Sequence, residues 1–264
     1  MDKKADIRGT REWAVAEVNC SRGCPHGCRY CYARYDQVIR RQLIPEADWL
    51  KCCDLPGEID KSRPLYDGQV MFPAAHDIIP ENLESCVKVI GKLLGAGNRV
   101  LIVSKPHLDC IQRLCREFYD CRDRILFRFT ITARNAEILS FWEPGAPVYQ
   151  ERLMALRSCY ERGFITSVSI EPMLHREDVV QMVYELLPYV SHSIWIGKMN
   201  RIDTRVSRVN AQFDKEIERI TLGQSDQELR LLYEELGHED KIRWKESVKE
   251  VLGLPLATKA GLDL

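Results

Sequence analysis

Three cysteines share the short stretch Gly23-Cys24-Pro25-His26-Gly27-Cys28-Arg29-Tyr30-Cys31-Tyr32, in the spacing C-x3-C-x2-C. A [4Fe–4S] cluster is normally held by four cysteine thiolates, so three thiolates leave one iron open to another ligand. An aromatic residue, Tyr30, stands directly before the third cysteine. The stretch therefore predicts an iron–sulfur centre with one open coordination position.

Cys20 lies shortly before Cys24 and allows two other interpretations of the same stretch. With Cys20 as a fourth ligand, the thiolates would form a tetrahedral zinc site or an electron-transfer cluster without an open iron. Structural zinc sites usually draw on two separated pairs of ligands, whereas these candidates crowd into about twelve residues of one loop. We therefore prefer the three-cysteine cluster and keep a non-catalytic zinc or closed iron–sulfur protein as the alternative.

The motif is similar to the cluster motif of the radical S-adenosylmethionine (radical SAM) superfamily. The resemblance implies that Cys24, Cys28 and Cys31 bind three irons and that S-adenosylmethionine chelates the fourth through its amino and carboxylate groups. It implies that Tyr30 lies against the adenine. It further implies reductive cleavage of the cofactor to a 5′-deoxyadenosyl radical, which acts on a substrate that the sequence does not name, with a flavodoxin or ferredoxin as reductant.

Within the superfamily, two segments resemble the spore photoproduct lyase and DNA-repair-photolyase-like branch. They are residues 23–34 and the sequence Glu143-Pro144-Gly145-Ala146-Pro147, followed by the helix that contains Arg152. The lyase is known for a hydrogen-donating cysteine near the end of the second strand, where this chain has Ala74, Ala75 and His76. We therefore regard a DNA-lesion lyase as disfavoured.

Composition bounds the class of protein. The chain has 264 residues with 45% hydrophobic content, enough for one large α/β domain. With 38 basic and 39 acidic residues, a net charge of −1 does not indicate a nucleic-acid partner. No apolar run reaches the roughly 20 residues that cross a bilayer, and no signal segment follows Met1, so we expect a cytoplasmic protein with reduced thiols.

Short apolar runs alternate with amphipathic segments up to about residue 200. Helices are expected after Pro80, Pro106, Pro147 and Pro172. The alternation predicts a parallel sheet with right-handed crossovers. Six units match the (β/α)6 partial TIM barrel that the resemblance implies. The expected strands are Trp13–Val18, Gln69–Phe72, Arg99–Ser104, Ile125–Thr132, Phe164–Glu171 and Ser193–Gly197.

Residues 201–264 have a different pattern, rich in charge. Helices are expected at Ser225–Leu236 and Asp240–Leu252, with Leu229, Leu232 and Leu236 on one apolar face. We therefore predict a radical SAM core in residues 1–200 and a helical extension in residues 201–264 that packs on it.

Polar residues follow the third and fourth strands, where ligands bind in parallel α/β folds. Ser104 and Lys105 are expected to pair with the methionyl carboxylate of the cofactor. Thr130 and Thr132 are expected to hydrogen-bond its ribose. The plain alternatives are a solvated lysine and threonines chosen for β propensity.

The second strand is followed by His76 and Asp77, which are expected to contact cofactor or substrate. An Asp before a helix is also an ordinary capping residue. Glu171 and Lys198 end the fifth and sixth strands and are expected at the mouth of the barrel. The sequence assigns no catalytic residue.

Overall fold

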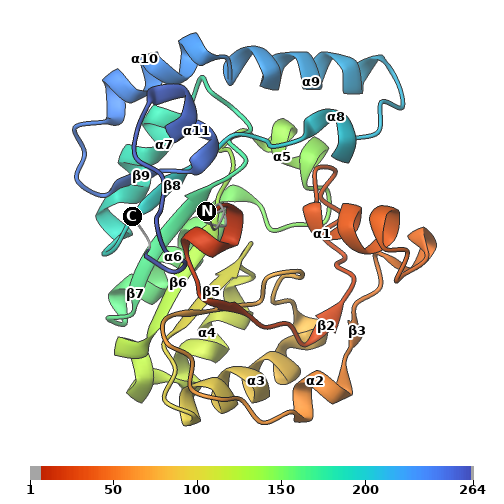
Figure 1. The fold of residues 1–264 in the computed structure, drawn as a ribbon, viewed down its shortest axis with the longest axis vertical. Coiled ribbons are helices and arrows are strands. Elements are labelled where there is room, and N and C mark those ends of the chain that lie inside the picture. Colours follow the sequence, from red (N-terminus) through yellow and green to blue (C-terminus); the bar gives the residue numbers. More distant parts are fainter. Residues whose placement is uncertain (1–6, 263–264) are drawn as a thin grey trace, which may run out of the picture.

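The structure, a computed structural model, describes residues 7–262 and contains a sheet of seven parallel strands. The strands lie side by side in chain order, as Figure 1 shows, and every neighbouring pair is parallel. All six predicted strands form, so the predicted α/β class is confirmed. The strands are β1 (Ala16–Glu17), β4 (Val70–Phe72), β5 (Val100–Ser104), β6 (Ile125–Thr130), β7 (Ile165–Ile170), β8 (Ile194–Ile196) and β9 (Ile242–Trp244).

Four longer helices connect the strands from β4 to β8 and correspond to the four predicted ones. Pro80 opens a short 3-10 turn, Pro80–Asn82, whose Asn82 side chain accepts a hydrogen bond from the Ile79 amide at 3.0 Å before the first helix begins. Each helix buries one apolar face. The helices are α3 (Leu83–Gly95), α4 (Leu108–Glu117), α6 (Tyr149–Glu161) and α7 (Val179–Leu186).

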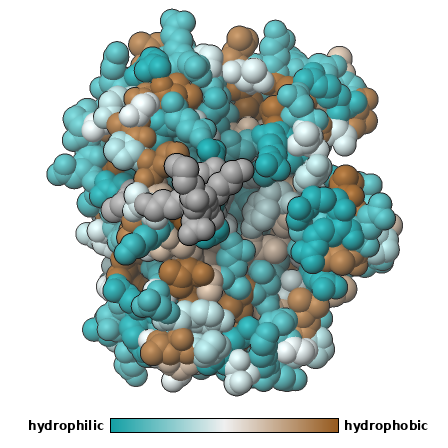
Figure 2. All heavy atoms as spheres, in the orientation of Figure 1, coloured by the Kyte–Doolittle hydropathy of each residue, from teal (hydrophilic) through white to brown (hydrophobic). Residues whose placement is uncertain are grey.

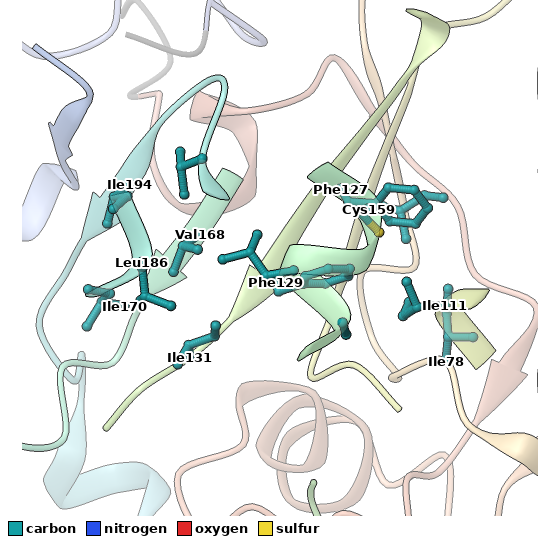
Figure 3. Packing of buried hydrophobic residues seen from close by; sticks show 14 of the residues in the cluster. Ile78, Ile111, Phe127, Phe129, Ile131, Cys159, Val168, Ile170, Leu186 and Ile194 are labelled. Atoms are coloured by element: carbon teal, nitrogen blue, oxygen red, sulfur yellow. The ribbon is translucent and has the colours of Figure 1, made fainter. Parts of the chain in front are cut away.

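Side chains of the sheet alternate between two apolar clusters, as the pleat of a strand requires. In β6, Phe127 and Phe129 point into the main core, where they pack with residues of the helices (Figure 3). Leu126, which directly precedes Phe127, belongs to a smaller cluster on the other face, with Trp13 and Trp195. The sheet is therefore covered by helices on one face and lines an interior space on the other.

The extension departs from prediction in more than one place, since the helix Ala211–Gly223 was not predicted. The helix predicted over Asp240–Leu252 is wrong in its first part, because Ile242–Trp244 forms β9 and pairs in parallel with β8. Ile242 and Trp244 are buried with Arg243 between them, a period of two residues that suits a strand. The helix predicted at Ser225–Leu236 is confirmed, with all three leucines buried.

The remaining elements are short or lie in the extension. Strands β2 and β3 pair in an antiparallel ladder that was not predicted. A π-helical turn, Tyr35–Arg40, follows α1. The elements are β2 (Ser21–Arg22), β3 (Cys53–Asp54), α1 (Tyr32–Arg34), α2 (Pro56–Asp60), α5 (Ala136–Trp142), α8 (Ile202–Arg205), α9 (Ala211–Gly223), α10 (Asp226–Leu236) and α11 (Glu246–Leu252).

Apolar side chains are scattered among polar ones over the face in Figure 2, and the surface is hollowed beside the lobe on the right, which carries α1 in Figure 1. Within residues 7–262, every helix falls short of the length and apolar character that a bilayer span requires.

Candidate functional site

The three motif cysteines line one cavity of about 730 Å³. They lie on the loop after β1, at the carboxyl end of the sheet, where the predicted site was expected. Cys24 and Cys28 are buried and Cys31 is half-buried at the start of α1. The thiols therefore face a space large enough for a small-molecule ligand, since such pockets typically measure about 300–1,000 Å³.

The cluster loop is held by residues 142–145, which begin at the last residue of α5. The amide of Arg29 donates to the carbonyl of Trp142 at 2.9 Å, and the amide of Gly145 donates to the carbonyl of His26 at 3.0 Å. A Cβ on Gly145 would lie 2.3 Å from the carbonyl oxygen of Pro25, so only glycine permits this approach. The two segments that carry the resemblance thus pack directly against each other.

A buried polar group orients Tyr30, the aromatic residue of the motif. Its hydroxyl donates to Glu143, which also accepts from Thr132 at 2.8 Å and from Arg152 at 2.5 Å. Glu143 and Arg152 are fully buried. Burial opposes the charge of Glu143, but Arg152 and then Lys105 outweigh it and lower the pKa of this carboxyl. The ring of Tyr30 is therefore fixed beside the cysteines by a charged pair.

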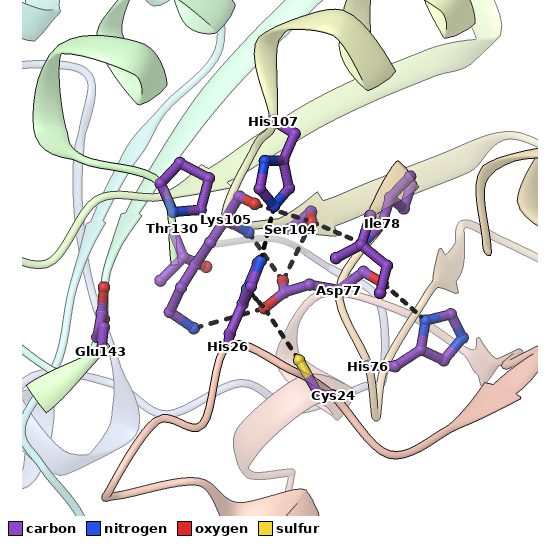
Figure 4. A network of polar contacts seen from close by, with 12 residues as sticks. Cys24, His26, His76, Asp77, Ile78, Ser104, Lys105, His107, Thr130 and Glu143 are labelled. Carbon is purple, nitrogen blue, oxygen red and sulfur yellow. Dashed lines mark hydrogen bonds and ion pairs between the residues drawn. The ribbon is translucent and has the colours of Figure 1, made fainter. Parts of the chain in front are cut away.

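A second polar group joins the cluster loop to the ends of β4 and β5 (Figure 4). Asp77 accepts from His26 at 2.8 Å, from the Lys105 amide at 2.8 Å and from the Ser104 hydroxyl at 3.1 Å. The other nitrogen of His26 lies 3.0 Å from His107. Burial opposes ionisation of Asp77, but Lys105 and His26 outweigh it and lower its pKa. Asp77 is therefore an ionised hub between three segments of the chain.

His76 and Cys20 form a third contact behind the loop. The Nε2 atom of His76 accepts from the amides of Cys20 and Ser21 at 3.2 and 3.3 Å. The Cys20 thiol is buried, 3.6 Å from the thiol of Cys86 and 3.8 Å from His76. Cys20 thus packs in the core between these two side chains.

The distances between possible ligand atoms test the alternative of a zinc site with four cysteine ligands. In a tetrahedral zinc site with Zn–S bonds of about 2.3 Å, the sulfurs stand roughly 3.8 Å apart. Across residues 7–262, the one group of three or more ligand atoms within 4.8 Å of one another is Cys24, His26 and Asp77. The four cysteines are therefore not gathered as such a zinc site requires.

The donor set fits an iron–sulfur cluster. Soft thiolates are the ligands that such clusters take. Burial raises the pKa of Cys24 to about 12 and raises those of Cys28 and Cys31 as well. These thiols therefore lose their protons together with metal binding, as thiol ligands generally do. Tyr30 and Lys105 line the same cavity and offer an aromatic face and a cation to a cofactor.

The predicted cofactor residues divide into two sets. Ser104 and Thr132 are buried and do not line the cavity within the described part of the chain; their hydroxyls bond to Asp77 and Glu143 instead. Glu171 and Lys198, expected at the mouth, do line the cavity. The residues of the cofactor prediction that line it are Tyr30, His76, Asp77, Lys105 and Thr130.

Sequence reasoning missed several residues of the site. Arg152 and Glu143 were quoted only as part of a resemblance, although a Glu and an Arg in one turn-helix segment could have suggested a pair. His26 stands inside the cysteine motif and was passed over. Nothing local marks Arg205 or Lys245, which reach the cavity from the extension.

The comparison with protein-family models finds no match. Among curated proteins, an uncharacterised protein of Acidianus two-tailed virus is 26% identical over 207 residues. The match covers 71% of this chain and 66% of the viral protein, so the chain spans just under two thirds of that relative.

Solved structures give a clearer result. A spore photoproduct lyase mutant with a dinucleoside spore photoproduct matches with a TM-score of 0.53 and 15% identity, over 92% of this chain and 79% of the lyase chain. The fold is that of the radical SAM proteins. A second radical SAM protein, SuiB from Streptococcus suis bound to S-adenosylmethionine, matches with a TM-score of 0.54 and 9% identity, over 94% of this chain and 54% of SuiB. The chain therefore shares its fold with these two proteins.

Proposed function

We propose that this protein is a radical SAM enzyme. It would bind a [4Fe–4S] cluster through Cys24, Cys28 and Cys31, cleave S-adenosylmethionine reductively, and use the radical on a substrate still to be identified. The observation that carries the proposal is the cavity in which the three motif thiols meet Tyr30 and Lys105, in a fold shared with radical SAM proteins.

We also propose that the sheet is the (β/α)6 partial barrel of that superfamily with one strand added. The sequential order from β1 to β8 and the helices between the strands support it. The cytoplasm, with a flavodoxin or ferredoxin as reductant, is the expected setting.

The proposal assigns roles to several residues in or beside the cavity. When bound, the cluster and its cofactor supply the electron transfer and the radical chemistry. Glu143 holds the Tyr30 ring so that it can stack on the adenine. The Lys105 ammonium, 5.6 Å from the centre of that ring, is positioned to bind the methionyl carboxylate. Thr130 lines the cavity and offers its hydroxyl to the ribose.

The walls of the cavity also protect the chemistry. Trp49 and Met71 are buried and line the cavity close to the loop, so apolar surface faces the bound cofactor. Exclusion of water strengthens charged contacts inside a site and suppresses side reactions of intermediates. Arg152 and Glu143 neutralise each other behind Tyr30 and so bring no free charge to this wall.

The proposal is tested on anaerobically purified, cluster-reconstituted protein. Dithionite and S-adenosylmethionine are expected to yield 5′-deoxyadenosine from the wild type and none from Cys28→Ala. Cys115→Ala, which removes a buried thiol outside the cavity, is the matched control and is expected to retain product. A bound metal without cofactor cleavage in the wild type would instead support the non-catalytic metal-binding alternative.

A further inference from the structure

The part of the cavity lining that lies outside the cluster loop is built largely from charged side chains. It comes from the chain near Trp13, from the end of β7, from the loop after β8 and from the start of α11. A cofactor placed at the cysteines would leave this wall to the substrate. The charges on this wall therefore indicate the charge of the substrate. The charged residues on it are Arg8, Arg11, Glu17, Glu171, Lys198, Arg201, Arg205, Lys245, Glu246 and Glu250.

The floor of this wall is neutralised from within the protein. Lys245 is fully buried, with its Nζ atom 2.5 Å from Glu12, 3.3 Å from Glu246 and 3.8 Å from Glu171. A Cβ on Gly197 would lie 2.8 Å from the Cγ atom of Lys245 and 2.9 Å from that of Glu171, so glycine at this position leaves room for both side chains. The floor thus has its own counter-charges.

The loop after β8 differs from this floor, because within the described residues its cations form no ion pair with a carboxylate. Lys198, Arg201 and Arg205 all line the cavity. Within residues 7–262, none of the three makes a side-chain ion pair or hydrogen bond, and the buried Nε atom of Arg205 has no partner. Burial and the neighbouring Arg201 lower the pKa of Arg205. Glu171 favours the charge of Arg205 without forming an ion pair with it. Half-buried positive charge that no carboxylate contacts is costly, and an anionic ligand would reduce that cost.

The loop is fixed rather than left to solvent. The Met199 amide donates to the side chain of Gln224 at 2.8 Å, and Gln224 donates in turn to the Met173 carbonyl at 2.6 Å. Arg201 adopts a left-handed backbone conformation with φ of 56°, which is unfavourable for a residue with a side chain. The three cations are therefore presented by an ordered backbone.

We propose that Lys198, Arg201 and Arg205 bind an anionic group of the substrate, a phosphate or a carboxylate. The inference rests on the proposed function, because it assigns this wall to the substrate. Guanidinium groups bind these planar or tetrahedral oxyanions through paired hydrogen bonds, which an ammonium cannot do. The other anion that the cavity would hold is the carboxylate of the cofactor, and the experiment separates the two.

The test is calorimetric titration of the reconstituted protein with sodium phosphate, and separately with sodium acetate, at constant ionic strength. Wild-type protein is expected to bind at least one of them, and Arg205→Gln is expected to weaken that binding tenfold or more. Arg205→Lys should fall between. The matched control is Arg208→Gln, which removes the same charge three residues away at an exposed position paired with Asp203 and Asp214. It should change binding less than twofold.

Three results would overturn the proposal. They are no binding of either anion by the wild type, equal binding by wild type and Arg205→Gln, or equal losses in Arg205→Gln and Arg208→Gln. Thermal unfolding of each variant shows whether a loss reflects misfolding, in which case Arg205→Lys decides.

The cofactor arm uses the same variants. Arg205→Gln is expected to weaken the binding of the anion more than the binding of S-adenosylmethionine. Weakened cofactor binding with unchanged anion binding would assign Arg205 to the cofactor and overturn the proposal. Failure of cofactor cleavage in the wild type would count against the enzyme itself, and the anion titration does not depend on it.

Discussion

The two walls of the cavity differ in how their charges are satisfied. On the cluster side, Asp77 and Glu143 each accept several hydrogen bonds and face a basic partner. On the wall formed by the loop after β8, the cations make no side-chain hydrogen bond or ion pair within the described residues. A wall that is complete by itself suits a permanent cofactor, whereas an incomplete one suits a ligand that comes and goes. The contrast leads to three tests, beyond those of the proposals.

The largest effect is expected on the complete wall, from Glu143→Gln. The change leaves Arg152 buried without its counter-charge, and breaking a buried ion pair typically costs about 3–5 kcal/mol. Urea unfolding should show this loss, and the reconstituted variant should also hold less iron, because the hydroxyl of Tyr30 then donates to a neutral amide in place of a carboxylate. Glu161→Gln breaks an exposed ion pair with Arg157 and should leave the midpoint nearly unchanged. Similar urea-unfolding curves for Glu143→Gln and Glu161→Gln would show that the ion pair of Glu143 with Arg152 does not stabilise the fold.

A smaller effect is expected from Gly145→Ala, which tests the contact between the cluster loop and residues 142–145. The added methyl group would overlap the Pro25 carbonyl, so we expect a loss of about 1–3 kcal/mol together with poorer cluster reconstitution. The control is Gly57→Ala in α2, where nothing lies within 4 Å of the new Cβ. If Gly145→Ala unfolds and reconstitutes its cluster like wild type, the close contact between Gly145 and the Pro25 carbonyl is not needed to hold the cluster loop.

The smallest effect concerns pH and the floor of the charged wall outside the cluster loop. Burial, with a hydrogen bond that protonated Glu12 donates to Glu246, raises the pKa of Glu12 to about 7. The folded state therefore holds a proton that the unfolded chain releases near its usual value of 4.5, so this contribution to stability is present below pH 4.5 and is lost as pH rises toward 7. In Glu12→Gln, the melting temperature should fall less between pH 5 and 7.5 than in wild type. An unchanged slope would show that Glu12 stays ionised.

The sequence predicted best what depends on local pattern. Six parallel strands and the helices between them follow from alternating apolar periods, and the cluster loop follows from cysteine spacing. It predicted poorly what depends on distant contacts. Ile242–Trp244 is three residues inside a charged segment, and only pairing with β8 makes it a strand.

The site also divides into features that local sequence predicts and features that depend on distant contacts. Thr132 was placed at the ribose by its position after a strand, yet its hydroxyl bonds to Glu143, which comes from a segment whose fold the pattern did not place. The unpartnered cations of the loop after β8 could not be foreseen either, because a missing partner is a property of the surroundings and not of the residue.

The pairing of β9 with β8 has a consequence for synthesis on the ribosome. Lys245 donates to the carbonyl of Gly9 at 2.8 Å across 236 residues of sequence. Until residues 242–250 have left the exit tunnel, a nascent chain lacks the last strand of the sheet and the floor of the cavity beside Trp13. Folding of the complete cavity is therefore a late event, which follows translation of nearly the whole described chain.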